Sequence, residues 1–145
     1  MNLPGPQVGS VIRFSFLWRH EADQGREEGA KDRPAAIIAS FIHDKTGKRK
    51  VLVLPITRTP PKDSSVAVEI PARTQRALGL GPDPCWVICD ETNRFTWPGH
   101  DVRLAPSPRG RDWIYGILPR GLFLEIAQRF AQIARHGRTK IVDRD

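Results

Sequence analysis

The feature that most constrains the fold is a strongly helical pattern close to the C-terminal end of the chain. Apolar residues recur there at helical spacing, at Leu122, Ile126, Phe130 and Ile133. Pro119 suits an early helical position and Gly137 suits the position after a last turn. We therefore expect a long helix between these two residues. The last residues, 136–145, are predicted to be a frayed tail.

The chain before this helix carries short apolar segments separated by turns and loops. Between Val11 and Trp18, apolar and polar residues alternate, which is typical of a half-buried strand. Further strands are predicted at residues 34–38, 50–56, 66–70, 85–89 and 93–97, and a short helix at 71–78. The polar segments 20–32 and 98–112 are predicted to be loops, and long loops in compact domains are often functional.

Five or six short strands followed by one helix predict a mainly β protein with α (α+β). The expected architecture is a small, strongly bent antiparallel sheet or SH3-like barrel with the C-terminal helix packed on it. A chain of 145 residues is expected to form a single domain, 1–145, with its core at about 9–135. We find no repeat, linker or second domain in the sequence.

Composition narrows the choice of partner and compartment. A net charge of +7 favours a polyanionic partner, namely nucleic acid, an anionic membrane surface or an acidic protein, although many soluble proteins are basic for no specific reason. No apolar run approaches the roughly 20 residues that span a bilayer, and no signal peptide is readable, so we expect a cytoplasmic protein without a membrane segment. Cys85 and Cys89 would lie about 13 Å apart on a strand, which excludes a disulfide and favours buried thiols.

Two polar residues stand at the ends of apolar segments. Arg33 precedes the predicted strand 34–38, and Thr57 follows the predicted strand 50–56. Neither a guanidinium nor a hydroxyl side chain is favourable inside a buried strand. We therefore expect both to face a shared surface outside the sheet.

Around these two residues the sequence resembles the MazF/PemK/Kid family of toxin endoribonucleases. Arg33-Pro34-Ala35 before one strand and Pro55-Ile56-Thr57 at the end of another are similar to the family's motifs. Further similar segments, in the same order, are Val8 to Phe14, Glu27 to Pro34 and Val87 to Arg94. The chain departs from the pattern in three ways: Cys89 stands where some members carry an arginine, and the segments 18–33 and 99–112 are long.

The resemblance implies a MazF/CcdB-like fold, a homodimer and the toxin of a type II toxin–antitoxin system. The implied activity is metal-independent, sequence-selective cleavage of single-stranded RNA by attack of its own 2′-hydroxyl, with no cofactor. The implied partners are the RNA substrate and a cognate antitoxin. The implied catalytic residues are Arg33, Thr57 and Glu91, and the implied substrate-binding residues are Glu28, His20, Arg58 and Arg94.

The residue chemistry fits these roles and leaves alternatives open. Arginine offers a fixed fork of donors to phosphate, and threonine offers a hydroxyl. The general base is not assigned by the sequence, and its candidates are Glu28, Glu91 and His20.

The other interpretations are structural or non-enzymatic. Arg33 could instead pair with Asp32 or Glu28, Thr57 could cap a turn, and Glu91 could pair with Arg94. A CcdB-like poison, which binds gyrase, or an inactive binding module on the same fold are the alternative functions.

Overall fold

The computed structural model describes residues 3–107 and 110–145. The strands are β1 (Ser10–Phe14), β2 (Arg33–Ile42), β3 (Arg49–Thr57), β4 (Ala67–Glu69), β5 (Trp86–Ile88), β6 (Glu91–Thr96), β7 (Val102–Arg103), β8 (Ala105–Ser107), β9 (Gly110–Asp112), β10 (Gly116–Ile117) and β11 (Lys140–Asp143). The helices are α1 (Arg19–Asp23), α2 (Ala72–Ala77), α3 (Arg120–Arg135) and a 3₁₀ turn at Ser64–Val66. The prediction of a mainly β, α+β protein with a long helix near its C-terminal end is confirmed.

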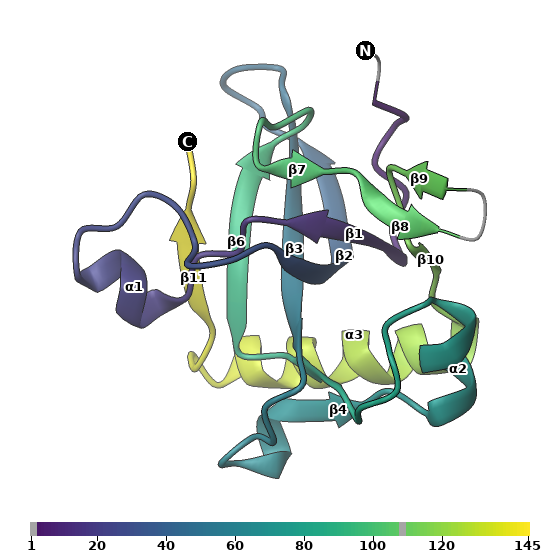
Figure 1. The fold of residues 1–145 in the computed structure, drawn as a ribbon. Helices are drawn as coiled ribbons and strands as arrows, with labels where there is room; N and C mark the ends of the chain where they lie inside the picture. The colour runs from purple at the N-terminus through teal and green to yellow at the C-terminus, as the bar shows by residue number, and fades with distance from the viewer. Residues whose placement is uncertain (1–2, 108–109) are drawn as a thin grey trace.

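The main sheet has the strand order β10-β1-β2-β3-β5-β4, with β7 paired to β1 and β6 paired to β3. All these pairs are antiparallel, whereas β11 joins the outer side of β6 in parallel. The sheet bends strongly, so that β1 and β7 cross in front of the long strands β2, β3 and β6 (Figure 1). Phe14 of β1 stacks on Phe95 of β6 at 4.6 Å between ring centroids, which ties the two ends of the bend together.

Both faces of the bent sheet are buried at β2 and β3, which explains why the middles of these two strands are continuous apolar segments. Along β2, Ala35 and Ile37 belong to an inner cluster shared with β1, β3, β6 and β7. Ala36 and Ile38 point the other way, into an outer cluster that includes Ile126 of α3. The apolar side of α3 therefore covers the outside of the sheet.

The structure confirms the predicted limits of the long helix. Pro119 is the N-cap of α3, and Gly137 lies just beyond its end with φ +67°, a conformation that glycine adopts without strain. Among the described residues, no helix has the length and apolar character needed to cross a membrane.

The predicted frayed tail is wrong. Lys140–Asp143 form β11, and Val142 is buried, so the core extends beyond the expected limit at residue 135. This strand has a single pair of apolar residues, Ile141 and Val142, which is too short a pattern to predict an element. Its order comes from pairing with β6, which lies far away in the sequence.

Two predicted loops are also more ordered than expected. The segment 20–32 contains most of α1, and the segment 98–112 contains β7, β8 and β9. Residues 108–109 of the second loop lie outside the described residues.

Candidate functional site

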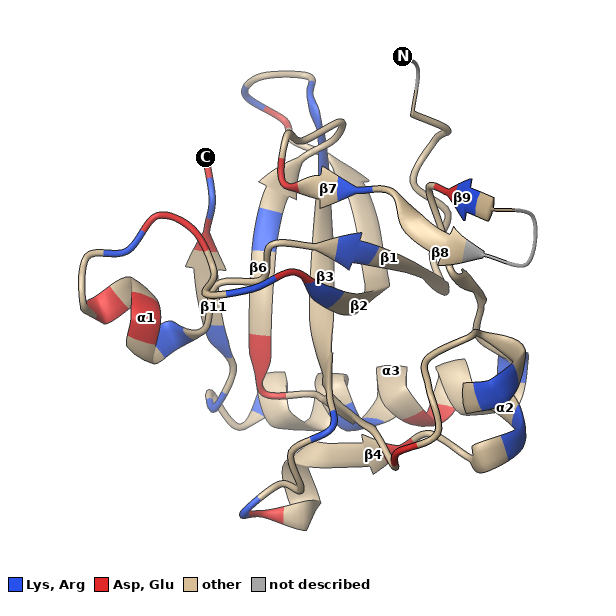
Figure 2. Ribbon diagram, in the orientation of Figure 1, with Lys and Arg blue, Asp and Glu red and all other residues tan. Residues whose placement is uncertain are grey.

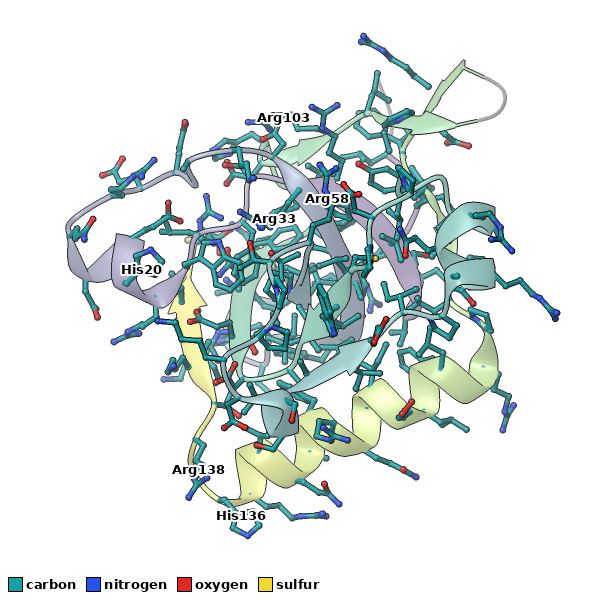
Figure 3. The ribbon with its side chains drawn as sticks, turned by 60° about the horizontal axis from the view of Figure 1, so that its bottom comes forward. His20, Arg33, Arg58, Arg103, His136 and Arg138 are labelled. Atoms are coloured by element: carbon teal, nitrogen blue, oxygen red, sulfur yellow. The ribbon has the colours of Figure 1, made fainter. Side chains whose placement is uncertain are left out.

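A cleft of about 980 Å³ opens where β2 begins and β3 ends. We call it the β2–β3 cleft. Its lining includes five of the seven predicted site residues, namely His20, Arg33, Thr57, Arg58 and Glu91. In the view of Figure 3, Arg33 lies between His20 and Arg58, whereas His136 and Arg138 lie at the other end of the molecule beside the end of α3.

The sheet register explains why Arg33 and Thr57 share this cleft. β2 pairs with β3 so that Ala35 lies opposite Pro55. The β2–β3 pairs end there, and beyond them Arg33 pairs with Phe14 of β1 and Thr57 with Trp86 of β5. Arg33 and Thr57 each stand two residues from the Ala35–Pro55 pair, so side-chain alternation puts both on the face of that pair. The prediction of a shared surface outside the sheet is therefore consistent with the geometry, since both residues line the cleft.

Arg33 is held by packing and keeps part of its hydrogen-bonding capacity unused. Its guanidinium carbon lies 5.0 Å from the centroid of the Trp18 ring. Its Nε is buried and has no hydrogen-bond partner among the described residues. Burial lowers the pKa of Arg33, and the negative charge of Glu21 partly opposes that shift. The buried Nε cannot be reached from the cleft, so an anion that enters would contact the terminal NH₂ groups of the guanidinium.

The alternative in which Arg33 pairs with Asp32 or Glu28 is not formed among the described residues. The Asp32 carboxylate instead faces Arg13 and Arg103 at 3.9 and 3.8 Å. Glu28 is exposed on the loop after α1 and is not part of the cleft lining.

Glu21 supports this side of the cleft, and sequence reasoning missed it. Its buried carboxylate accepts hydrogen bonds from the backbone N–H groups of Trp18 and Ala30 and from the Arg26 guanidinium. It thereby fixes Trp18, on which Arg33 rests, to the loop that leads into β2. The signal in the sequence was the position of Glu21 three residues after Trp18, as in a capping box at the start of α1.

Thr57 has one contact that the sequence alternative anticipated. Its Oγ1 accepts a hydrogen bond from the Thr59 N–H at 3.1 Å, so the side chain caps the turn after β3. The hydroxyl hydrogen remains available to donate into the cleft. The neighbouring Arg58 is exposed and lies 3.5 Å from Asp83, which is equally exposed.

The cleft lining also includes a carboxylate with a perturbed pKa, that of Glu91. Burial raises the pKa of Glu91, while a hydrogen bond from the Arg19 N–H and the charge of Lys140 act against that rise. His20 lines the same region and is exposed. Lys140 also lies 3.8 Å from Asp90.

Arg94 does not line the cleft, and the alternative in which it pairs with Glu91 is not formed. Residues three apart on a strand point to opposite faces, so Arg94 is turned away from Glu91. Arg94 donates two hydrogen bonds of 2.5 Å to the carboxylate of Asp143 on β11. That contact raises the pKa of Arg94 and lowers the pKa of Asp143.

Three half-buried tryptophans, of which Trp18 lines the cleft, pack against other apolar side chains. Trp18 makes an edge contact with Phe16 at 5.3 Å, and Trp97 and Trp113 pack on the inner cluster. Cys85 and Cys89 are buried and unpaired, and burial raises the pKa of Cys89 to about 12.

Among residues 3–107 and 110–145, no three His, Cys, Asp or Glu side chains are grouped so as to hold a metal ion. No model of a known protein family matches the chain, and no curated protein gives a significant match.

Proposed function

We propose that this protein is a sequence-selective endoribonuclease that cleaves single-stranded RNA without a metal, built on a MazF/CcdB-like barrel. The observation that carries the proposal is Arg33, whose buried Nε has no partner at a cleft that Thr57 also lines. A half-buried cation without an anionic partner is costly, and a phosphate bound in the cleft would supply that partner. The resemblance of the Arg-Pro-Ala and Pro-Ile-Thr segments to the toxin family points to the same two residues.

The cleft residues divide the chemistry of RNA cleavage among them. The 2′-hydroxyl attacks the adjacent phosphorus, and the bond to the 5′-oxygen of the next nucleotide breaks. Arg33 stabilises the extra negative charge on the phosphate oxygens, and Thr57 donates its hydroxyl to one of them. A proton leaves the 2′-hydroxyl for a base, and another proton must reach the departing 5′-oxygen.

Glu91 is the better placed base. It lines the cleft, and its raised pKa makes it a stronger proton acceptor than an ordinary glutamate. His20 is the second candidate from the same lining. Glu28 and Arg94 are withdrawn from the proposed site, because neither lines the cleft.

Partners and setting follow from the resemblance and the charge. We propose a cytoplasmic toxin that assembles as a homodimer and is neutralised by a cognate antitoxin. The +7 charge favours an acidic inhibitory segment in that antitoxin. A CcdB-like poison that acts without catalysis remains the alternative, and a cleavage assay separates the two.

The test is incubation of purified protein with a long RNA in EDTA, followed by mapping of the cut sites. We expect cuts at a short recurring sequence in the wild type. Arg33→Ala should slow cleavage about 100-fold or more, and Thr57→Ala should slow it by a smaller factor. Arg94→Ala is the matched control, since it removes an arginine outside the cleft. A folded Arg33→Ala protein that cuts at the wild-type rate would overturn the assignment.

A further inference from the structure

A second group of arginines lies beside Arg33, and the ion pairs that it forms within the fold are weak. Arg13 on β1 and Arg103 on β7 are direct cross-strand partners in an antiparallel pair. Like charges placed opposite each other in this way destabilise a sheet. Figure 2 shows basic positions on β1, on β7 and at the start of β2, with an acidic position among them.

The acidic residue, Asp32, does not balance this group. One of its carboxylate oxygens lies 3.9 Å from Nε of Arg13 and 3.8 Å from Nε of Arg103. Both distances exceed those of a hydrogen bond. The side chains of Arg13, Asp32 and Arg103 are 41%, 28% and 36% exposed, so the two ion pairs are screened by water and stabilise the fold little. With Lys31 and Arg33 on either side of it in the chain, Asp32 faces an excess of positive charge.

The position of this group relative to Arg33 suggests its ligand. Arg13 lies opposite Pro34 on β2, so its side chain leaves the sheet on the other face from that of Arg33, yet Arg13 and Asp32 line the same cleft as Arg33. A chain with regularly spaced phosphates that lies along this cleft passes both Arg33 and Arg13, and Arg103 pairs with Arg13 on the neighbouring strand.

We propose that Arg13 and Arg103 form a second phosphate site, which binds the phosphate adjacent to the one held at Arg33 in a single-stranded RNA. The Asp32 carboxylate lies near both guanidinium groups and competes with the phosphate for them. This inference rests on the proposed function, because it takes RNA as the ligand of the cleft. It adds a binding site that acts on affinity rather than on the cleavage step.

The experiment measures binding of a 2′-O-methyl RNA oligonucleotide, which cannot be cleaved, at several salt concentrations. Loss of a phosphate contact in single-stranded RNA lowers the slope of log affinity against log salt by about 0.7. We expect the double variant Arg13→Ala/Arg103→Ala to show this lower slope and weaker binding at low salt. The double variant Arg73→Ala/Arg76→Ala is the matched control, because both of these exposed arginines lie on α2 away from the cleft lining.

A third variant separates a phosphate site from a salt bridge of purely structural use. Asp32→Asn removes the competing carboxylate, so it should tighten RNA binding, by roughly three-fold from the worth of one exposed ion pair. Unchanged or weaker binding by Asp32→Asn, with a wild-type urea midpoint, would contradict the proposal. So would an unchanged salt slope in the Arg13→Ala/Arg103→Ala variant, or a loss of affinity for an acidic peptide without loss for RNA. Because the oligonucleotide is not cut, these outcomes are read independently of whether the wild type cleaves RNA in EDTA.

Discussion

Two basic regions of this molecule differ in how closely their positive charges are paired with carboxylates. At the edge formed by β6 and β11, the cations are tightly paired: Arg94 bonds Asp143 at 2.5 Å, and Lys50 bonds Asp145 at 2.7 Å. At the β2–β3 cleft, Arg33 has an unpartnered Nε, and Arg13 shares one carboxylate with Arg103 of the neighbouring β7 at distances beyond a hydrogen bond. Residue counts and net charge do not distinguish these two regions. What distinguishes them is how closely each cation is paired with an anion.

Arg144, in the edge region, is a buried cation whose guanidinium is paired and hydrogen-bonded on several sides. Its side chain is 3% exposed and lies 3.3 Å from Asp101. It also donates hydrogen bonds to the backbone carbonyls of Ser15 and Glu27 and to the side chain of Asn93. This arginine joins the end of the chain to the segment that carries α1 and is therefore a structural residue. Arg33 has no such hydrogen bond or ion pair among the described residues, and Arg13 and Arg103 share one carboxylate, while Arg103 also donates a hydrogen bond to the His100 carbonyl. This weaker pairing is why we assign these arginines to a ligand.

The largest expected effect comes from removing that structural arginine. Arg144→Ala leaves Asp101 buried without its cation and should lower the free energy of unfolding by about 3–5 kcal/mol. Arg33→Ala should change the same quantity by less than about 1 kcal/mol, since it loses only a stacking contact. Urea unfolding followed by far-UV circular dichroism measures both. Equal losses in the two variants would remove the contrast between the regions.

The next effect tests the support beneath the cleft. Glu21→Ala removes the acceptor of the Trp18 and Ala30 N–H groups and should lower the free energy of unfolding by about 2 kcal/mol. Cleavage should also slow, because Trp18 positions Arg33. Glu28→Ala is the control on the same loop, and its exposed carboxylate should be dispensable for both measurements. A Glu21→Ala protein with full activity would show that Arg33 needs no such support.

A smaller effect is expected at the exposed pair on the edge. Arg94→Ala breaks the two-bond contact with Asp143, which is partly screened by water, and should lower the free energy of unfolding by about 1 kcal/mol or less. RNA affinity and cleavage should remain those of the wild type. A loss of RNA affinity in this variant would show that the edge also binds nucleic acid.

The sequence predicted those features that depend on local pattern and strand ends. Alternation and apolar spacing identified most of the strands and the long helix. The common placement of Arg33 and Thr57 followed from their positions at the ends of two strands, which prove to be neighbours in antiparallel register. Chain direction and side-chain alternation are enough to predict such a meeting.

The features that the sequence did not predict depend on contacts between distant segments. β11 has too few apolar residues to be recognised, and its order comes from pairing with β6. The contacts of Glu21 depend on how the loop after α1 folds back, and this loop has no periodic apolar pattern in the sequence from which its path could be predicted. Arg94 was assigned to the site because the segment Val87 to Arg94 resembles a family segment with a basic residue three positions after the acidic one, and an odd spacing on a strand turns these two side chains apart.

The smallest expected effect is a difference in pH dependence between the two regions. Hydrogen bonding to Arg94 lowers the pKa of Asp143 from its ordinary 3.8, whereas burial raises the pKa of Glu91 from its ordinary 4.5. A lowered carboxylate pKa adds stability above the unfolded value, and this stability is lost as the pH falls through the folded value. A raised carboxylate pKa has the opposite sign, so ionisation of Glu91 costs stability as the pH rises through its folded value.

Single substitutions at these two carboxylates should therefore shift stability in opposite directions. At pH 7, Asp143→Asn should have a lower urea midpoint than the wild type and Glu91→Gln a higher one. The Asp143→Asn difference should shrink as the pH falls below the ordinary 3.8 of an aspartate and vanish below the lowered folded pKa. The Glu91→Gln difference should shrink as the pH falls through the raised folded pKa of Glu91 and vanish below the ordinary 4.5 of a glutamate. Both groups are partly exposed, so the shifts should be small and are best read as differences between matched pH series. If Glu91 is also the base, the cleavage rate should fall over the pH range in which the Glu91→Gln stability difference disappears, and a rate that stays constant there would leave His20 as the base.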